Sequence, residues 1–207
     1  MIRVDNIHKS YGEHIILEDL SFTIEPGSMV AIVGESGSGK TTLLNIIGGI
    51  ESVDKGVVEV NGKNILKLKN RSLQKYLREE VSFLFQSYAL MEDKTVYENI
   101  SIVPPLDKKN ESKKMAETVL ETVGLKGYGN RIVASLSGGE QQRVSLARIM
   151  LKPSTIILAD EPTGNLDSKN SEVVLNLFRK INQSGKTVIV VTHDKSLLNH
   201  FDKIIEL

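Results

Sequence analysis

Short apolar segments recur along the chain, and helical patterns separate several of them. The β-type runs lie at residues 15–24, 29–33, 57–60, 81–85, 155–159 and 187–191. Several of these runs are continuously apolar, so we expect strands that are covered on both faces. Strands that alternate with helices are typical of α/β proteins with a mostly parallel sheet. The sequence therefore predicts an α/β fold built around such a sheet.

Two helical patterns and one turn signal refine this picture. An apolar face over residues 172–181 is formed by Val173, Val174, Leu177, Phe178 and Ile181. A second helix, ended by Gly124, has an apolar face that consists of Met115, Val119, Leu120 and Val123. The Asn61-Gly62 pair is a turn signal that predicts some antiparallel sheet near the amino end.

The distribution of helical and β-type segments predicts the organisation of the chain. Residues 87–151 are almost purely helical in pattern, and β-type runs lie on both sides of them. We expect one domain over 1–207, with 1–86 and 152–207 as its core and 87–151 as an inserted helical lobe. Tyr76, Met150 and Phe178 are expected to be core residues.

Composition disfavours several classes of protein. Of the 207 residues, 26 are Lys or Arg and 26 are Asp or Glu, so the formal net charge is zero, whereas proteins that coat nucleic acid are usually basic. The absence of cysteine excludes disulfides and thiolate metal sites. The longest apolar runs, such as 187–192, are too short to span a bilayer, and residues 1–5 lack the apolar stretch of a signal peptide. Any link to a membrane is therefore expected to come through a partner.

A glycine-rich turn predicts phosphate binding. It follows the apolar run 29–33, precedes an expected helix over 42–47, and fits the pattern G-x-x-x-x-G-K-[ST]. Glycines let the backbone aim N–H groups at phosphate oxygens, and the positive end of the helix adds to the attraction. The lysine would neutralise phosphate charge, and the last hydroxyl would bind Mg²⁺. The alternative is a strand-to-helix turn with a solvated lysine, although a chance match occurs with a frequency on the order of 1%. The residues of this cradle are Gly34, Glu35, Ser36, Gly37, Ser38, Gly39, Lys40, Thr41 and Thr42.

Two acids end the apolar run 155–159. Asp160 and Glu161 would lie at the carboxyl end of a strand, where ligands bind in open α/β sheets. Asp160 suits the coordination of Mg²⁺, and Glu161 suits a general base that activates water for attack on a phosphate. His193 follows the run 187–191 and could contact the same phosphate. Taken alone, such acids are more often part of a turn and such a histidine is usually without function, but the nearby phosphate cradle favours the functional interpretation.

The hexamer Leu-Ser-Gly-Gly-Glu-Gln at residues 136–141 resembles the signature motif of ABC ATPases. Ser137 can cap the helix that follows, Gly138 and Gly139 allow close backbone approach, and the helix start attracts anions. Other family motifs occur in the family's order. The resemblance implies that Tyr11 stacks on adenine, that Gln86 senses Mg²⁺ and water as a catalytic residue, and that His193 is a catalytic switch residue. It also places Glu140 and Asp167, the latter in the stretch Asn-Leu-Asp at 165–167, among the nucleotide-binding residues.

The resemblance further implies an architecture and partners. The fold would be a P-loop NTPase core with a mostly parallel sheet, an amino-side antiparallel β region and the inserted helical lobe. Two copies, or this chain and a paired cassette, would hold two ATP molecules with Mg²⁺ between them, each site taking the cradle of one chain and residues 137–139 of the other. Transmembrane permease subunits would bind near Gln86, which implies a cytoplasmic protein on the inner face of the cell membrane.

The stretch from 158 to 167 is similar to the exporter group that handles macrolides, lipoproteins and antimicrobial peptides such as bacteriocins, and residues 96–100 also suit that group. Residues 91–94 depart from the proline-containing stretch common there. The alternatives are a soluble ABC-type ATPase that acts on nucleic acid or ribosomes, a P-loop kinase or GTPase, and a degenerate cassette that serves as a scaffold. The first usually carries two cassettes or coiled-coil insertions, the second would lack residues 136–141, and the third would lack the catalytic set.

Overall fold

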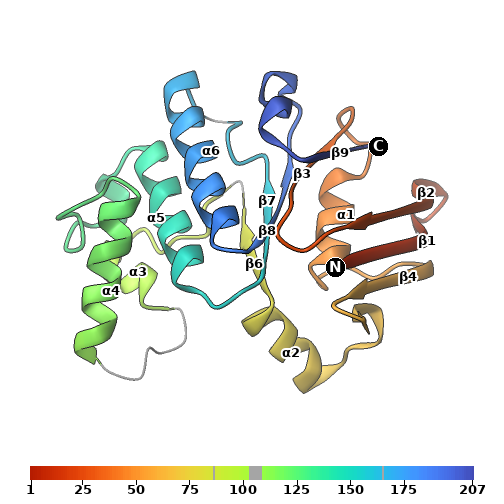
Figure 1. Cartoon of the computed structure of the whole chain (residues 1–207), viewed down its shortest axis with the longest axis horizontal. Helices are drawn as coiled ribbons and strands as arrows, with labels where there is room; N and C mark the ends of the chain where they lie inside the picture. Colours follow the sequence, from red (N-terminus) through yellow and green to blue (C-terminus); the bar gives the residue numbers. More distant parts are fainter. Residues whose placement is uncertain (86, 103–108, 165) are drawn as a thin grey trace.

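Two β-sheets organise the computed structural model, which describes residues 1–85, 87–102, 109–164 and 166–207 (Figure 1). The first sheet is parallel throughout, with the order β6 (Val81–Leu84), β7 (Ile156–Asp160), β8 (Thr187–Val191), β3 (Met29–Val33) and β9 (Lys203–Glu206). The second sheet is antiparallel, with the order β2 (His14–Ile24), β1 (Ile2–Tyr11), β4 (Lys55–Val60) and β5 (Lys63–Asn64). The predicted α/β class with an amino-side antiparallel region is confirmed.

Helices cover the parallel sheet on both faces (Figure 1). α1 (Lys40–Ile47) lies between the two sheets, α5 (Gly138–Leu151) and α6 (Ser168–Gln183) lie on the opposite side of the parallel sheet, and α2 (Asn70–Glu79) precedes β6. α3 (Val96–Ile100) and α4 (Lys109–Thr122) lie beyond α5, away from the sheet. Single 3-10 turns occur at Ile65–Lys67 and Val133–Ser135, and a longer one at Lys195–His200.

Alternate residues of the parallel strands pack in two separate hydrophobic cores, one on each face of the sheet. Ile157 and Ala159 of β7 pack in the core formed with α5 and α6, whereas Ile156 and Leu158 pack in the core formed with α1 and the antiparallel sheet. Successive side chains of a strand point to opposite faces, so a strand covered on both sides must be apolar throughout. This explains the unbroken apolar runs of the sequence, and it fixes the strand ends that carry the candidate site.

The segments predicted from apolar runs are strands, but two strands escaped prediction. β1 alternates buried and exposed residues, and β9 has one buried residue in four, so neither has an unbroken apolar run. At the predicted turn between β4 and β5, Asn61 and Gly62 have φ values of 49° and 76°, the left-handed conformation that such a turn requires. The described part of 87–151 consists of helices joined by turns, with one isolated bridge as its β-type feature, and the boundaries of a separate lobe stay a prediction.

Two predicted core positions are wrong at the helix edges. Met115 of α4 is 41% exposed and Val173 of α6 is 38% exposed. Successive helix residues are about 100° apart, so each lies at the margin of an apolar face centred on its neighbours. Val174 and Phe178, by contrast, are at most 1% exposed. Tyr76 is buried as expected, and Met150 is half-buried against the core.

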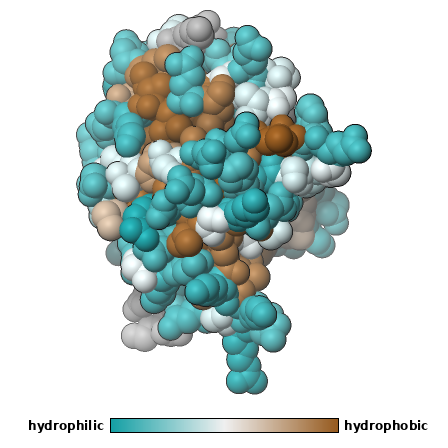
Figure 2. Space-filling model, turned by 90° about the vertical axis from the view of Figure 1, so that its right-hand side faces the viewer, coloured by the Kyte–Doolittle hydropathy of each residue, from teal (hydrophilic) through white to brown (hydrophobic). Residues whose placement is uncertain are grey.

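Figure 2 shows the side of the molecule that carries the antiparallel sheet. Hydrophilic residues cover most of this side, and apolar patches interrupt them. The exposed apolar residues of the strands include Ile15 of β2, which is 57% exposed, and Ile204 of β9, which is 47% exposed. Among the described residues, no helix has both the length and the hydrophobicity needed to cross a membrane.

Candidate functional site

The glycine-rich cradle joins β3 to the start of α1, as the sequence predicts. Gly37 and Gly39 have φ values of 84° and 93°, which side-chain-bearing residues rarely adopt. A Cβ atom on Gly39 would also lie 2.7 Å from a methyl carbon of Ile16 in β2. The turn therefore needs glycine at residue 39 both for its backbone conformation and for its packing against the antiparallel sheet.

The Lys40 side chain is hydrogen-bonded to the backbone of the cradle itself. The Lys40 ammonium donates to the carbonyls of Gly34 at 3.0 Å and Glu35 at 2.6 Å, although the residue is only 8% exposed. The Ser38 hydroxyl is buried and makes no hydrogen bond to any described residue. A buried hydroxyl normally finds a partner, so Ser38 presents an unused polar group inside a turn rich in N–H donors. The cradle thus combines a cation, backbone donors and a free hydroxyl, which suits a phosphate group.

Thr41 connects the cradle to the neighbouring acids. Its hydroxyl donates to both carboxylate oxygens of Asp160, at 2.9 and 3.2 Å. Burial raises the pKa of Asp160 above its ordinary value, and the nearby Glu161 raises it further, whereas the Thr41 hydroxyl and Lys40 lower it. A hydroxyl and a carboxylate side by side are oxygen ligands of the kind that Mg²⁺ prefers.

Glu161 follows Asp160 with a φ of 47°, an uncommon conformation for a residue with a side chain. Its N–H donates to the carbonyl of Val191, which binds it to the end of β8 at 3.0 Å. One carboxylate oxygen, Oε2, lies 2.9 Å from Nδ1 of His193. The angles at this contact do not meet hydrogen-bond geometry, and Oε2 is buried without a hydrogen-bond partner among the described residues. The two side chains are therefore in close contact without a hydrogen bond. The Glu161 side chain is 19% exposed and the His193 side chain is 71% exposed.

A cavity of about 660 Å³ opens beside this pair. It lies at the carboxyl ends of β7 and β8, between the start of α6 and the 3-10 turn at Lys195–His200. Polar groups on its wall include Thr163, Ser171, Asp194 and His200 in addition to Glu161 and His193. Glu161 and His193 therefore border open space, whereas Asp160 is not part of this wall.

The Ser-Gly-Gly segment forms the start of α5. Ser137 caps this helix in a reciprocal arrangement: its hydroxyl accepts from the Glu140 N–H at 3.4 Å, and the Glu140 carboxylate accepts from the Ser137 N–H at 2.8 Å. This backbone hydrogen bond is the main reason that the pKa of Glu140 is lowered. Within the described residues, no hydrogen bond or ion pair joins Ser137–Glu140 to the cradle at 34–42. One chain thus holds both anion-attracting sites but does not bring them together.

The remaining candidates occupy different surroundings. Tyr11 ends β1, is 50% exposed and has the Lys9 ammonium 4.8 Å from its ring centre. Asp167 is the N-cap of α6, where its carboxylate accepts from the Asn170 N–H at 2.8 Å. Gln86 lies outside the described residues. The exposed ring of Tyr11 is free to stack on a ligand, whereas Asp167 already has a structural role.

Sequence reasoning missed two residues that surround the site. Gln142 of α5 is 2% exposed and donates through its side-chain amide to the carbonyl of Pro162, directly after Glu161. Asn170 of α6 contacts Asp167, and its side chain would lie 3.2 Å from a Cβ atom on Gly139. Nothing in the local sequence distinguishes either amide from a solvated one, because the contact of Gln142 with Pro162 and that of Asn170 with Gly139 both join distant segments.

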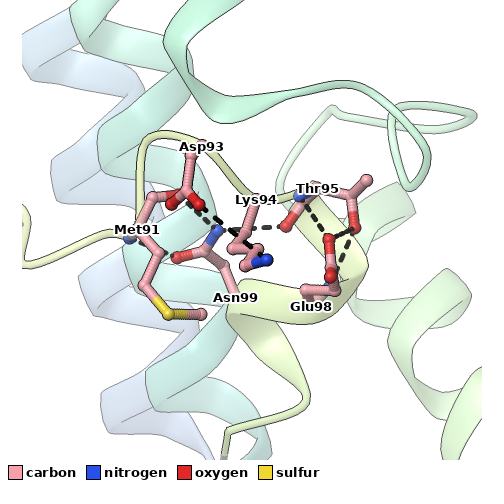
Figure 3. A network of polar contacts seen from close by, with 6 residues as sticks. All are labelled: Met91, Asp93, Lys94, Thr95, Glu98 and Asn99. Carbon is pink, nitrogen blue, oxygen red and sulfur yellow. Dashed lines mark hydrogen bonds and ion pairs between the residues drawn. The ribbon is translucent and has the colours of Figure 1, made fainter.

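The segment at 91–94 is held by a buried asparagine (Figure 3). Asn99 of α3 is fully buried, and its amide binds both backbone polar groups of Met91, at 2.8 and 3.0 Å, and the carbonyl of Thr95 at 3.0 Å. Thr95 and Glu98 form a second reciprocal cap at the start of α3. The backbone of this segment is therefore fixed by side-chain hydrogen bonds.

A phosphate cradle on a parallel sheet, with paired acids at the end of another strand of the same sheet, defines a P-loop ATPase domain. The profile described as ABC transporter matches residues 17–164. The chain belongs to the ABC transporter family and is an ATPase domain of it.

The curated relatives agree with this assignment. The chain is 40% identical over 209 residues to the macrolide export ATP-binding/permease protein MacB of Campylobacter jejuni. The match covers 100% of this chain and 33% of that protein. It is also 40% identical over 204 residues to the cell division ATP-binding protein FtsE of Escherichia coli, covering 96% of this chain and 90% of that protein. The chain thus spans about a third of the length of the MacB relatives.

The solved structures agree as well. The ATP-binding cassette MJ0796, described as a dimer in a post-hydrolysis state bound to ADP and Pi, superposes with a TM-score of 0.90 at 37% identity and covers 100% of this chain and 94% of that one. CbiO1 of Clostridium perfringens has a TM-score of 0.89 at 24% identity, covering 99% of this chain and 83% of that one, which shows the shared fold.

Proposed function

We propose that two copies of this chain, or this chain and a paired cassette, bind two ATP molecules between them and hydrolyse them to drive export through separate membrane subunits. The observation that carries the proposal is the separation of the two anion-attracting sites. The cradle at 34–42 and the capped helix start at Ser137 are both formed, yet within one chain they do not meet. A head-to-tail pair would place the helix start of each copy against the phosphates held by the other.

The residues present fit Mg²⁺ together with a nucleoside triphosphate. The described residues contain no cluster of three or more acidic, histidine or cysteine ligands. Mg²⁺ is usually held by one or two carboxylates together with substrate phosphates and water, and Asp160 with the Thr41 hydroxyl supplies such a partial set. When bound there, Mg²⁺ would neutralise charge on the phosphate oxygens.

Chemistry in the site would divide among the side chains. Lys40 would exchange its two backbone carbonyl partners for phosphate oxygens, since an ammonium favours the more negative acceptor. Glu161 would accept the proton of the attacking water as general base. His193, whose Nδ1 lies 2.9 Å from the Glu161 carboxylate, would contact the γ-phosphate. Tyr11 would stack on adenine, Gln86 would complete the catalytic set, and Glu140 and Asp167 would border the nucleotide.

A second groove suits the membrane partner. It has a volume of about 280 Å³ between β6 and α5, and Phe83 and Ile102 provide its apolar part. Phe85, which is 40% exposed, stacks on Phe83 with ring centres 5.2 Å apart. Three cations complete the lining: Arg78, Arg148 and Lys152. We propose that a short helix of a permease binds here, which would place the chain at the inner face of the cell membrane. The similarity to the macrolide export protein MacB supports a drug as the exported molecule, and we propose a peptide, bacteriocin or lipoprotein as the other candidates.

The direct test uses the purified chain and its Glu161→Gln variant. The parent is expected to hydrolyse ATP and to dimerise transiently, whereas the variant is expected to bind ATP without turnover and to remain dimeric in size-exclusion chromatography. A Glu161→Gln protein that binds ATP only as a monomer would contradict the composite site. The groove is tested by co-purification with the permease. The parent is expected to co-purify, and the Phe85→Glu variant is expected not to.

A further inference from the structure

We propose that Gln142 is a positioning residue for Glu161, because it holds the backbone that follows the acid from the helix that Ser137 begins. The inference rests on the proposed function, since it assumes that Glu161 is the general base. Gln142 is 2% exposed, and its side-chain amide donates to the carbonyl of Pro162. Among the described residues, this amide is the single donor to that carbonyl.

The backbone on either side of Glu161 is held by few contacts. The Glu161 N–H donates to Val191, and the Glu161 carbonyl accepts from the Gly164 N–H at 3.2 Å. Proline has no N–H, so Pro162 can be held through hydrogen bonds only by its carbonyl. The left-handed conformation at Glu161 is uncommon for such a residue and persists where surrounding contacts determine it. The amide of Gln142 therefore supplies a contact that the loop cannot supply for itself.

The helix that carries Gln142 is itself fixed at this end. Ser137 and Glu140 cap it, and the Arg143 guanidinium donates to the Asn170 amide oxygen at 3.4 Å. Asn170 in turn donates to both oxygens of Asp167, at 3.1 and 3.0 Å. The start of α5, the start of α6 and the loop after Glu161 are thus joined by side-chain amides, and Gln142 is the member that reaches the loop.

In the proposed pair, the two ends of this part of α5 would act on different active sites. Ser137 would serve the nucleotide of the partner copy, whereas Gln142, five residues further along the chain, holds the acid of its own copy. Displacement of a reacting group by 1 Å lowers rates by about a hundredfold. Loss of the Gln142 amide should therefore slow hydrolysis while ATP binding and closure of the pair remain.

The test is Gln142→Met, which keeps the volume and length of the side chain but removes the donor. We expect kcat for ATP hydrolysis to fall by at least about tenfold while KM changes by less than about threefold. The variant should also accumulate an ATP-bound dimer in size-exclusion chromatography, because closure occurs and hydrolysis is slow. A general loss of structure would instead weaken the dimer. If Gln142→Met folds poorly, Gln142→Asn removes one methylene group, shortens the reach and should act in the same direction.

Asn182→Leu is the matched control. Asn182 also donates from a side-chain amide to loop carbonyls, of Gly27 at 2.7 Å and Lys186 at 3.0 Å, but it lies at the opposite end of α6 from the site. It should lower thermal stability and leave kcat per folded molecule unchanged.

Two outcomes would overturn the assignment. One is a kcat of Gln142→Met equal to that of the parent. The other is a fall in kcat accompanied by loss of the ATP-bound dimer, which would mean that Gln142 supports the helix start at Ser137 rather than the position of Glu161. The parent and Glu161→Gln proteins are assayed in parallel. If Glu161→Gln hydrolyses ATP at the parent rate, the proposed general base fails and the inference fails with it. If these two behave as expected, the Gln142 result bears on the inference alone.

Discussion

Nδ1 of His193 lies 2.9 Å from Oε2 of Glu161, and the two residues follow the ends of adjacent parallel strands. The sheet fixes their spacing, because β7 and β8 are paired in register up to Asp160 and Val191. The carboxylate is sheltered at 19% exposure, whereas the imidazole is 71% exposed. The geometry thus places a shielded acid behind an accessible ring, which suits a base that meets its water inside a closed site.

The Glu161→Gln variant should retain ATP binding and lose turnover. General bases contribute roughly 10²- to 10⁴-fold to rate, so kcat should fall by at least about a hundredfold while the Kd for ATP changes little. Steady-state hydrolysis and calorimetric binding measure the two quantities. A Glu161→Gln protein with the parent kcat would remove this residue from the role of base.

The Lys40→Ala variant should bind ATP at least about tenfold more weakly, because charge-assisted hydrogen bonds to phosphate are lost. The variant also loses the two hydrogen bonds to the carbonyls of Gly34 and Glu35. Isothermal calorimetry with a non-hydrolysable ATP analogue measures the change. Lys63→Ala, at an exposed position of β5, is the matched control. Equal affinity of Lys40→Ala and the parent would contradict the assignment of the cradle.

The Gly138→Asp variant should fold and bind ATP but fail to form the closed pair. An acid in the first turn of α5 suits the positive end of a helix, so the monomer should keep its stability. The new Cβ atom would have the Tyr88 hydroxyl, at 3.3 Å, as its one close neighbour among the described residues. In the pair, however, the added carboxylate would face the phosphates of the partner copy.

Size-exclusion chromatography of Gly138→Asp in the Glu161→Gln background measures this effect, with Gly138→Ala as control. An ATP-stabilised dimer of the double variant would exclude residues 137–139 from the composite site.

The Asp160→Asn variant should be more thermostable than the parent at pH 7 when nucleotide and Mg²⁺ are absent. Burial raises the pKa of Asp160, so the folded chain binds this proton more tightly than the unfolded chain does. The folded state is therefore destabilised as pH rises through the ordinary pKa of the group towards its raised value. The gain in Tm should shrink at pH values below the ordinary range, where Asp160 is protonated in both states.

Asp54→Asn is a control of opposite sign. Hydrogen bonds from the Ser10 hydroxyl and N–H lower the pKa of Asp54, so its contribution to stability is present at neutral pH and is lost on acidification. Scanning calorimetry in a chelator at several pH values compares the variants. A lower Tm for Asp160→Asn than for the parent at pH 7 would contradict the raised pKa. Loss of hydrolysis by Asp160→Asn is expected in the same preparation.

The positions of most strands and of the cradle could be predicted because their signals are local. Residues 29–33 and 34–41 are contiguous, and a buried strand followed by glycines needs no partner to be recognised. β1 was missed because its residues alternate between buried and exposed, a weaker signal than an unbroken apolar run.

The contacts of Gln142 with Pro162 and of Asn170 with Arg143 could not be predicted. Each joins segments 20 or more residues apart, which only the fold brings together. Asp167 shows a further limit. Its motif predicts a contact with nucleotide, whereas the fold gives it the N-cap of α6, and the sequence does not rank the two roles.

The buried amide of Asn99 leaves the side chains of the segment before α3 largely unconstrained. Its three hydrogen bonds reach only backbone atoms of Met91 and Thr95, so the path of the loop does not depend on which side chains residues 91–94 carry. Met91 is 39% exposed, and the Asp93 side chain is 80% exposed. Such a loop can exchange its outward residues while its shape is retained, so the chemistry of this surface can change without loss of the fold.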